Sequence, residues 1–93
     1  MLFMMTWKIL PGCYKAAVER FLRTGAPLPD GMKMIGRWHA PGSSHGYLVI
    51  EGTLEQAYEH AAEWADLLEM VTTPVLQDAD AGAISAKVAG TDL

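Results

Sequence analysis

The sequence contains little cysteine, few basic residues and no long hydrophobic run. Cys13 is its single cysteine, so no internal disulfide forms and a reducing compartment is sufficient for folding. Seven lysines and arginines stand against eleven aspartates and glutamates, and the resulting net charge of -4 is unfavourable for binding nucleic acid or an anionic membrane. No stretch approaches the roughly 18 to 20 uninterrupted apolar residues of a membrane span. We therefore expect a cytoplasmic protein with neither a nucleic-acid partner nor a membrane partner.

The length of the chain predicts one domain, and its composition predicts a second copy. Chains divide into separate cores only well beyond ~200 residues. Residues 1–93 are therefore expected to form a single domain, with 78–93 as a C-terminal tail or short helix. Hydrophobic residues make up 51% of the chain. A monomer of this size buries only about 60 to 65% of its unfolded surface, so the apolar excess needs another surface to cover it. We therefore expect a homodimer.

Hydrophobic periodicity predicts alternating strands and helices. The apolar run that opens the chain ends at Pro11 and Gly12, and it lacks the basic segment and cleavage site of a signal peptide, so we interpret it as a strand. Thr53 and Gln56 have the pattern of a capping box at the start of the second helix. Pro74 in the last strand indicates an edge position or a bulge. In chain order, strand, helix, strand, strand, helix and strand are expected at residues 2–10, 14–25, 32–40, 47–52, 53–68 and 71–77.

This order of elements predicts an α+β fold. Strand-helix-strand crossovers are right-handed, so two such units build a four-stranded antiparallel sheet with both helices on one side. The result is a ferredoxin-like βαββαβ sandwich whose other sheet face carries no helix. A second copy that covers this bare face would explain the apolar excess.

The expected hairpin predicts which side chains share a face of the sheet. With its loop centred near Ser43, His39 lies opposite Tyr47 and Arg37 lies opposite Val49. The face expected beneath the helices is then wholly apolar and carries Met32, Met34, Gly36, Trp38, Leu48 and Ile50. The bare face is expected to mix apolar and polar side chains, namely Lys33, Ile35, Arg37, His39, Tyr47, Val49 and Glu51.

Four polar residues of the expected bare face have the chemistry of a small binding site. His39 is the candidate catalytic residue, because an imidazole can act as a general base near neutral pH. Arg37 can stabilise an enolate or carboxylate, Tyr47 can donate a hydrogen bond, and Glu51 can orient the histidine or neutralise the arginine. The alternative is that these groups only pair across a dimer interface, because buried charges are usually paired.

The signals for a metal, a cofactor or RNA are weak. His39, His45 and Glu51 are metal-ligand types, but they do not have a recognised zinc spacing. His60 could ligate haem, although a helix histidine is more often at the surface or half-buried. Residues 45–51 resemble part of the RNP1 string of RNA-recognition modules, but Glu51 stands where a base should stack. We therefore expect no metal, no cofactor and no RNA ligand.

Short motifs spread over almost the whole chain carry a resemblance to a family. They are Leu2-Phe3-Met4-Met5-Thr6-Trp7, Gly36-Arg37-Trp38-His39, Gly46-Tyr47 with Glu51, Trp64-Ala65-Asp66-Leu67 and Thr73-Pro74-Val75. With these motifs the chain resembles a family of small, uncharacterised bacterial proteins, a domain of unknown function, of the dimeric α+β barrel superfamily. The resemblance implies a dimeric ferredoxin-like fold that binds hydrophobic, often aromatic ligands between sheet and helices. If the site lies there, Trp7, Trp38 and Trp64 become wall residues.

These observations together predict a homodimer that binds a small apolar or aromatic ligand. The residues expected at the ligand are Arg37, His39, Tyr47, Glu51, Trp38 and Trp64. One open alternative is an enzyme of the cofactor-independent monooxygenase or cyclase type, in which His39 removes a proton and Arg37 holds the anion. Another is a structural or interaction module without a ligand.

Overall fold

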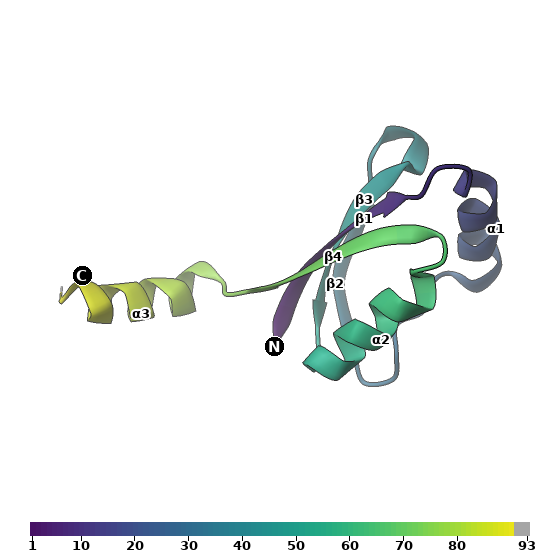
Figure 1. Cartoon of the computed structure of the whole chain (residues 1–93). Helices are drawn as coiled ribbons and strands as arrows, with labels where there is room; N and C mark the ends of the chain where they lie inside the picture. The colour runs from purple at the N-terminus through teal and green to yellow at the C-terminus, as the bar shows by residue number, and fades with distance from the viewer. Residues whose placement is uncertain (91–93) are drawn as a thin grey trace.

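Figure 1 shows the computed structural model, which describes residues 1–90. Over these residues the chain forms β1 (Leu2–Ile9), α1 (Tyr14–Thr24), β2 (Lys33–His39), a short 3-10 turn (Pro41–Ser43), β3 (His45–Glu51), α2 (Leu54–Trp64), β4 (Leu68–Val75) and α3 (Asp78–Ala89). The sheet order is β2-β3-β1-β4, and every neighbouring pair is antiparallel. Helices α1 and α2 lie on one side of the sheet (Figure 1). The predicted α+β, ferredoxin-like βαββαβ fold is therefore confirmed.

The core lies between the sheet and helix α2. Phe3 and Met5 of β1 point towards the helices and are fully buried, because the side chains of a strand alternate between its two faces. Leu48 and Ile50 of β3 and Ala57 of α2 complete this core. Burying a large apolar side chain contributes about 1.5 to 3 kcal/mol, so these residues hold the helix on the sheet.

The ends of both packed helices follow local sequence signals. At the start of α2, the Thr53 hydroxyl accepts a hydrogen bond from the backbone N–H of Gln56 (3.1 Å), and Oε1 of Gln56 accepts one from the backbone N–H of Thr53 (2.8 Å). The predicted capping box is therefore confirmed. Gln56 Nε2 also donates to the Asp30 carbonyl (2.7 Å), which ties the α1–β2 connection to α2. Helix α1 ends at Thr24, and the next residue, Gly25, has a φ of 71° that costs little without a Cβ.

Strand β4 lies at the edge of the sheet, as Pro74 predicts, but it begins earlier than expected. Pro74 is opposite Phe3 of β1, and the other side of β4 has no strand neighbour among the described residues. The strand begins at Leu68 rather than Val71, and α2 ends at Trp64. Leu68 fits both the apolar stripe of a helix and the alternation of a strand. Its pairing with Ile9 of β1 places it in the strand.

The register between β2 and β3 differs from the predicted one because β2 is irregular. The pairing shifts by one residue between Met34 and Gly36, which is the signature of a β-bulge. His39 therefore lies opposite Gly46, whereas the register predicted for a regular hairpin placed it opposite Tyr47. That prediction was wrong, because one extra residue in a strand reverses the face of every side chain that follows it.

Side chains that follow the bulge lie on the face opposite to the predicted one. Arg37 is opposite the buried Leu48, so Arg37 and His39 face the helices. Trp38 is opposite Tyr47, and these two side chains are 56% and 47% exposed on the bare face. Other members of the two sets keep their predicted faces: Met34, Leu48 and Ile50 towards the helices, and Lys33, Tyr47, Val49 and Glu51 on the bare face.

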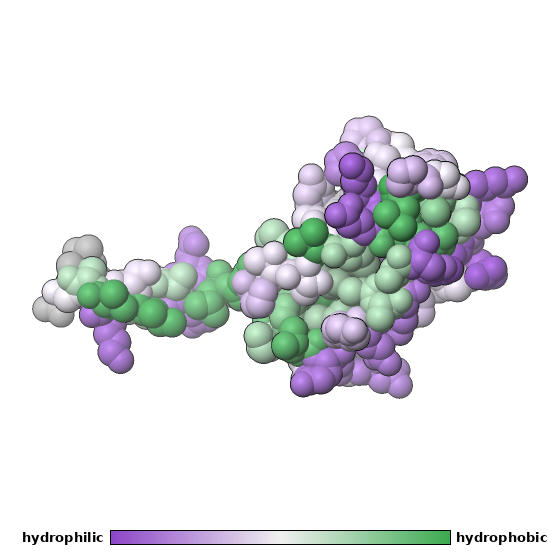
Figure 2. All heavy atoms as spheres, viewed as in Figure 1, coloured by the Kyte–Doolittle hydropathy of each residue, from purple (hydrophilic) through white to green (hydrophobic). Residues whose placement is uncertain are grey.

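Helix α3 extends away from the rest of the chain (Figure 1), and none of its residues is buried. The radius of gyration is 16.1 Å, whereas a compact domain of this length has about 12 Å. Leu76, Ile84 and Val88 are exposed, and Figure 2 shows apolar surface in green along this segment. The expected tail at 78–93 thus contains a helix, and its residues 91–93 lie outside the described part. Within residues 1–90, every helix is too short or too polar to cross a bilayer.

Candidate functional site

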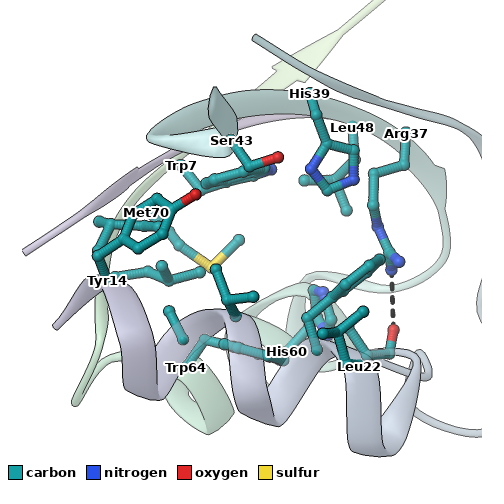
Figure 3. A pocket seen from close by; sticks show the side chains of 16 residues that line it. Trp7, Tyr14, Leu22, Arg37, His39, Ser43, Leu48, His60, Trp64 and Met70 are labelled. Carbon is teal, nitrogen blue, oxygen red and sulfur yellow. Dashed lines mark hydrogen bonds between the residues drawn. The ribbon is translucent and has the colours of Figure 1, made fainter. Parts of the chain in front are cut away.

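A cavity of about 230 Å³ lies between the sheet and helices α1 and α2 (Figure 3). Most of its lining is apolar or aromatic and consists of Trp7, Ile9, Tyr14, Ala17, Val18, Phe21, Leu22, Ala26, Leu48, Trp64, Leu68 and Met70. The polar groups of the lining come from Arg37, His39, Ser43 and His60. Apolar walls with a few polar groups are typical of small-molecule sites.

The cavity has an exposed rim and a buried end. Tyr14, Leu22 and His39 are exposed at the rim. Leu48 and His60, in contrast, are only 2% and 3% exposed. A small molecule could therefore reach the cavity from solvent without a change of fold.

Arg37 brings a positive charge into the cavity. Its Nη2 donates to the Ala26 carbonyl (2.8 Å) and its Nη1 to the Gly25 carbonyl (3.3 Å), directly after α1. Its Cζ lies 5.6 Å from the centre of the Phe21 ring. Burial lowers the pKa of Arg37 from its ordinary value, but an arginine stays protonated at neutral pH. Within residues 1–90, no carboxylate forms an ion pair with Arg37.

His60 of α2 is the buried polar residue of the cavity. Its Nδ1 has no hydrogen-bond partner among the described residues, because the nearest carboxylate oxygen, Oε2 of Glu63, is 3.8 Å away and too distant for a hydrogen bond. Burial, followed by the nearby charge of Arg37, lowers the pKa of His60. His60 is therefore neutral at pH 7, with one nitrogen able to donate and the other able to accept.

His39 lies at the rim between two aromatic side chains. The centre of its ring is 5.3 Å from that of Trp7 and 5.3 Å from that of Phe21, and both contacts are edge-to-face. Such contacts restrict the orientation of the imidazole. Glu51, which was expected to orient His39 or neutralise Arg37, lies opposite Leu2 at the far end of the sheet. That expectation was wrong, because Glu51 lies on the other face.

Arg20 and Asp66 hold the Trp64 wall of the cavity. The guanidinium of Arg20 donates to both carboxylate oxygens of Asp66 (2.9 and 2.6 Å) and to the backbone carbonyl of Glu63 (3.1 Å). Its Cζ also lies 5.2 Å from the centre of the Trp64 ring. The hydrogen bonds from Arg20 lower the pKa of Asp66. This fork connects α1 to the end of α2, so it stabilises the position of both helices around the cavity.

The structure divides the residues expected at the ligand between the two faces of the sheet. The cavity brings together Arg37, His39 and Trp64. The residues on the bare face are Trp38, Tyr47 and Glu51. Trp38 was expected under the helices, and the bulge in β2 is the reason that it lies on the other side.

Sequence reasoning missed several wall residues of the cavity. His60 follows Ala57 by three residues and precedes Trp64 by four, which is the spacing of one buried helix face. This signal was available in the sequence. Tyr14 and Phe21 share the inner face of α1 in the same way, but only the fold shows that this face leaves space beneath it.

The bare face of the sheet is apolar and aromatic at its centre and charged towards its ends. Its exposed apolar members include Met4, Trp38, Tyr47 and Val71. Lys8 lies opposite Glu69, and Lys33 lies opposite Glu51, so opposite charges are neighbours across the strands. This surface therefore has the anatomy of an interface, with an apolar centre and a polar rim.

The histidines and acidic residues of the described chain do not form a metal centre. Among residues 1–90, no three His, Cys, Asp or Glu side chains come close enough together to hold a metal ion. His39 faces the cavity, whereas His45 contacts Tyr47, with ring centres 6.2 Å apart.

Comparison with known proteins identifies the family of the chain. A family described as a domain of unknown function, DUF3303, matches residues 1–89. No curated protein and no solved structure matches the chain significantly. The family match covers the whole sheet, both helices of the cavity and α3. The chain therefore belongs to the DUF3303 family.

Proposed function

We propose that the protein is a homodimer that binds a small apolar or aromatic molecule in the cavity between its sheet and helices α1 and α2. The observation that carries this proposal is the cavity of about 230 Å³ with largely apolar and aromatic walls. Arg37 and His60 supply polar groups at one end of it. Sites for drug-sized ligands usually measure about 300 to 1,000 Å³. This cavity is smaller than that range, so a ligand of one or two rings fits best.

A structural module without a ligand is the main alternative. Protein interiors are close-packed, and voids larger than a water molecule are few. In this chain, the side chains of Trp7, Phe21 and Trp64 surround unfilled space, and the rim of that space is exposed. A cation in an apolar site also costs free energy that a bound polar group would offset. Both features support ligand binding.

The bare face of the sheet supports the proposed homodimer. Trp38, Tyr47 and Val71 are each about half exposed there, and aromatic side chains are frequent anchors of protein interfaces. Face-to-face packing of two sheets would bury these residues. This arrangement is the one expected of the dimeric α+β barrel superfamily, and the ferredoxin-like fold is compatible with it.

A cofactor-independent monooxygenase or cyclase is a second candidate function, favoured by the placement of Arg37 and His39. The two residues lie on β2 and line the same cavity. His39 would remove a proton from an activated carbon acid, and Arg37 would hold the resulting anion. On a substrate identified from co-purified material, His39→Ala should lower turnover at least about 100-fold. Full turnover by this variant would exclude the mechanism.

A matched pair of variants on α1 tests the binding site. Ala17 is buried in the cavity wall, whereas its neighbour Ala16 is exposed. Isothermal titration calorimetry with 2-naphthamide, a neutral two-ring probe, should show binding to the native protein. Ala17→Leu should lower the affinity at least about tenfold by filling the cavity, and Ala16→Leu should leave it unchanged. Equal affinities of the two folded variants would contradict the proposed site.

A further inference from the structure

We infer that the cavity selects an anionic ligand, a small aromatic carboxylate whose head group lies between Arg37 and His60. This inference rests on the proposed binding function and narrows it to one chemical class of ligand.

Arg37 has no carboxylate partner among residues 1–90. Its guanidinium has five N–H donors, and its hydrogen bonds within residues 1–90 go to the carbonyls of Gly25 and Ala26. Both acceptors are neutral, and no carboxylate of the described chain forms an ion pair with it. Charges in partly apolar surroundings are normally paired. A ligand carboxylate would supply the missing negative charge and accept charge-assisted hydrogen bonds.

His60 is a buried polar residue in the wall of the cavity. The residue is 3% exposed, it lines the cavity, and its Nδ1 has no partner among the described residues. A buried polar atom without a hydrogen bond costs about 1 to 3 kcal/mol. The accessible ring nitrogen of His60, Nε2, can donate one hydrogen bond to a ligand carboxylate, while Nδ1 is fully buried on the side of Glu63. The acidic group nearest to His60, Glu63, has a side chain that is 47% exposed, and its oxygen is 3.8 Å away.

The cavity has two chemically different ends, one charged and one uncharged. Figure 3 shows Arg37 and His60 towards one end, and Trp7, Tyr14, Ser43 and Met70 towards the other, where the polar groups are two uncharged hydroxyls. Arg37 comes from β2 and His60 from α2, so they approach the space from opposite layers of the fold. A ligand with a flat apolar body and a charged head would match both ends at once. A wholly apolar ligand would leave the polar end without partners.

A pair of isosteric probes tests this inference on the full-length protein. 2-Naphthoate and 2-naphthamide share one ring system and differ in the charge of the head group. By isothermal titration calorimetry at pH 7.5, the native protein should bind 2-naphthoate at least about tenfold more tightly, since hydrogen bonds between charged groups are about twice as strong as neutral ones. Equal affinities would overturn the inference and leave the proposed binding function intact. Binding of neither probe would contradict both.

Two variants locate the head group. Arg37→Met removes the charge and should abolish the preference for 2-naphthoate, while Arg23→Met removes an exposed charge at the end of α1 and should preserve it. Because Arg37 also fastens the α1–β2 connection, His60→Phe provides a second measurement and should weaken 2-naphthoate at least about threefold more than 2-naphthamide. If a folded Arg37→Met or His60→Phe variant keeps the full preference, the head group does not lie at this end and the inference fails.

Discussion

The two faces of the sheet differ in what they contain and in what they lack. Among residues 1–90, the helix-covered face carries a cation without a carboxylate partner and a buried histidine nitrogen without a hydrogen bond, and both residues line unfilled space. The bare face carries exposed aromatic residues, and its charges lie opposite charges of the other sign. The covered face therefore suits a small molecule, and the bare face suits another protein surface.

A single irregularity in β2 assigns the key residues to these faces. Without the shift between Met34 and Gly36, Arg37 and His39 would lie on the bare face and Trp38 beneath the helices. With the shift, the polar residues line the cavity and the large aromatic residue is exposed. One inserted residue can therefore exchange the side chains of two sheet faces while the order of strands stays the same.

The largest expected effect comes from adding one methyl group to a glycine on each face. A Cβ at Gly46 would lie 2.3 Å from the Trp7 ring and 2.5 Å from the backbone oxygen of Trp38, and a strand backbone moves only with its sheet. Gly46→Ala should therefore lower the free energy of unfolding by about 3 kcal/mol. The three atoms nearest to a Cβ at Gly36 all belong to the Trp38 ring, at 2.3 Å and beyond, and in a monomer this ring can turn into solvent, so Gly36→Ala should cost less than about 1 kcal/mol. Urea denaturation at a concentration where the chain is monomeric measures both free energies, and equal losses would contradict the contrast.

The next effect tests the bare face as a dimer interface. Trp38→Lys should raise the dimer dissociation constant at least about 30-fold, because a buried aromatic anchor contributes about 2 kcal/mol or more. Tyr58→Lys makes a similar change at a residue that is 77% exposed on α2 and should leave association unchanged. Sedimentation velocity over a concentration series distinguishes the two. A native protein that sediments as a single chain at micromolar concentration would exclude this interface.

A smaller effect is the pH dependence that His60 confers on stability. The folded-state pKa of His60 is lowered by burial and by the charge of Arg37, so the unfolded chain takes up this proton more readily. The contribution of the neutral histidine to the free energy of unfolding is fully present above about pH 6.5, the pKa of an unfolded-chain histidine. This contribution is lost as the pH falls through the lowered pKa of the folded state. The slope is at most about 1.4 kcal/mol per pH unit. Thermal unfolding between pH 7 and 5 should show a flatter profile for His60→Phe.

The exposed histidine of β3 provides the control for that experiment. His45 is exposed and lies outside the cavity between sheet and helices, so His45→Phe should keep the native slope. If His60→Phe and the native protein lose stability in parallel between pH 7 and 5, the histidine is not buried as described.

The smallest expected effect is removal of α3. None of the residues of this helix is buried, so a chain that ends at Gln77 should change the free energy of unfolding of the ferredoxin-like body by less than about 0.5 kcal/mol. Denaturation at a concentration where the chain is monomeric measures this. A larger loss would show that α3 packs against the body in solution.

Local features of the fold were predictable from the sequence, and the contents of the cavity were only partly so. The Thr53–Gln56 capping box and the edge position of Pro74 depend on residues close in the chain, and both are confirmed. The carboxylate partner of Arg20 is Asp66, which lies just beyond the end of α2. Partners across two helices depend on how the helices cross, which periodicity does not report.

The amino-acid sequence by itself determined the order of strands and helices, their caps and the ferredoxin-like topology. These depend on periodicity and on hydrogen bonds between residues a few positions apart. The tertiary structure alone decided the bulge in β2, and through it the face on which Arg37 and His39 lie. The physical reason is that a bulge is a property of two paired strands, so alternation along one strand does not reveal it.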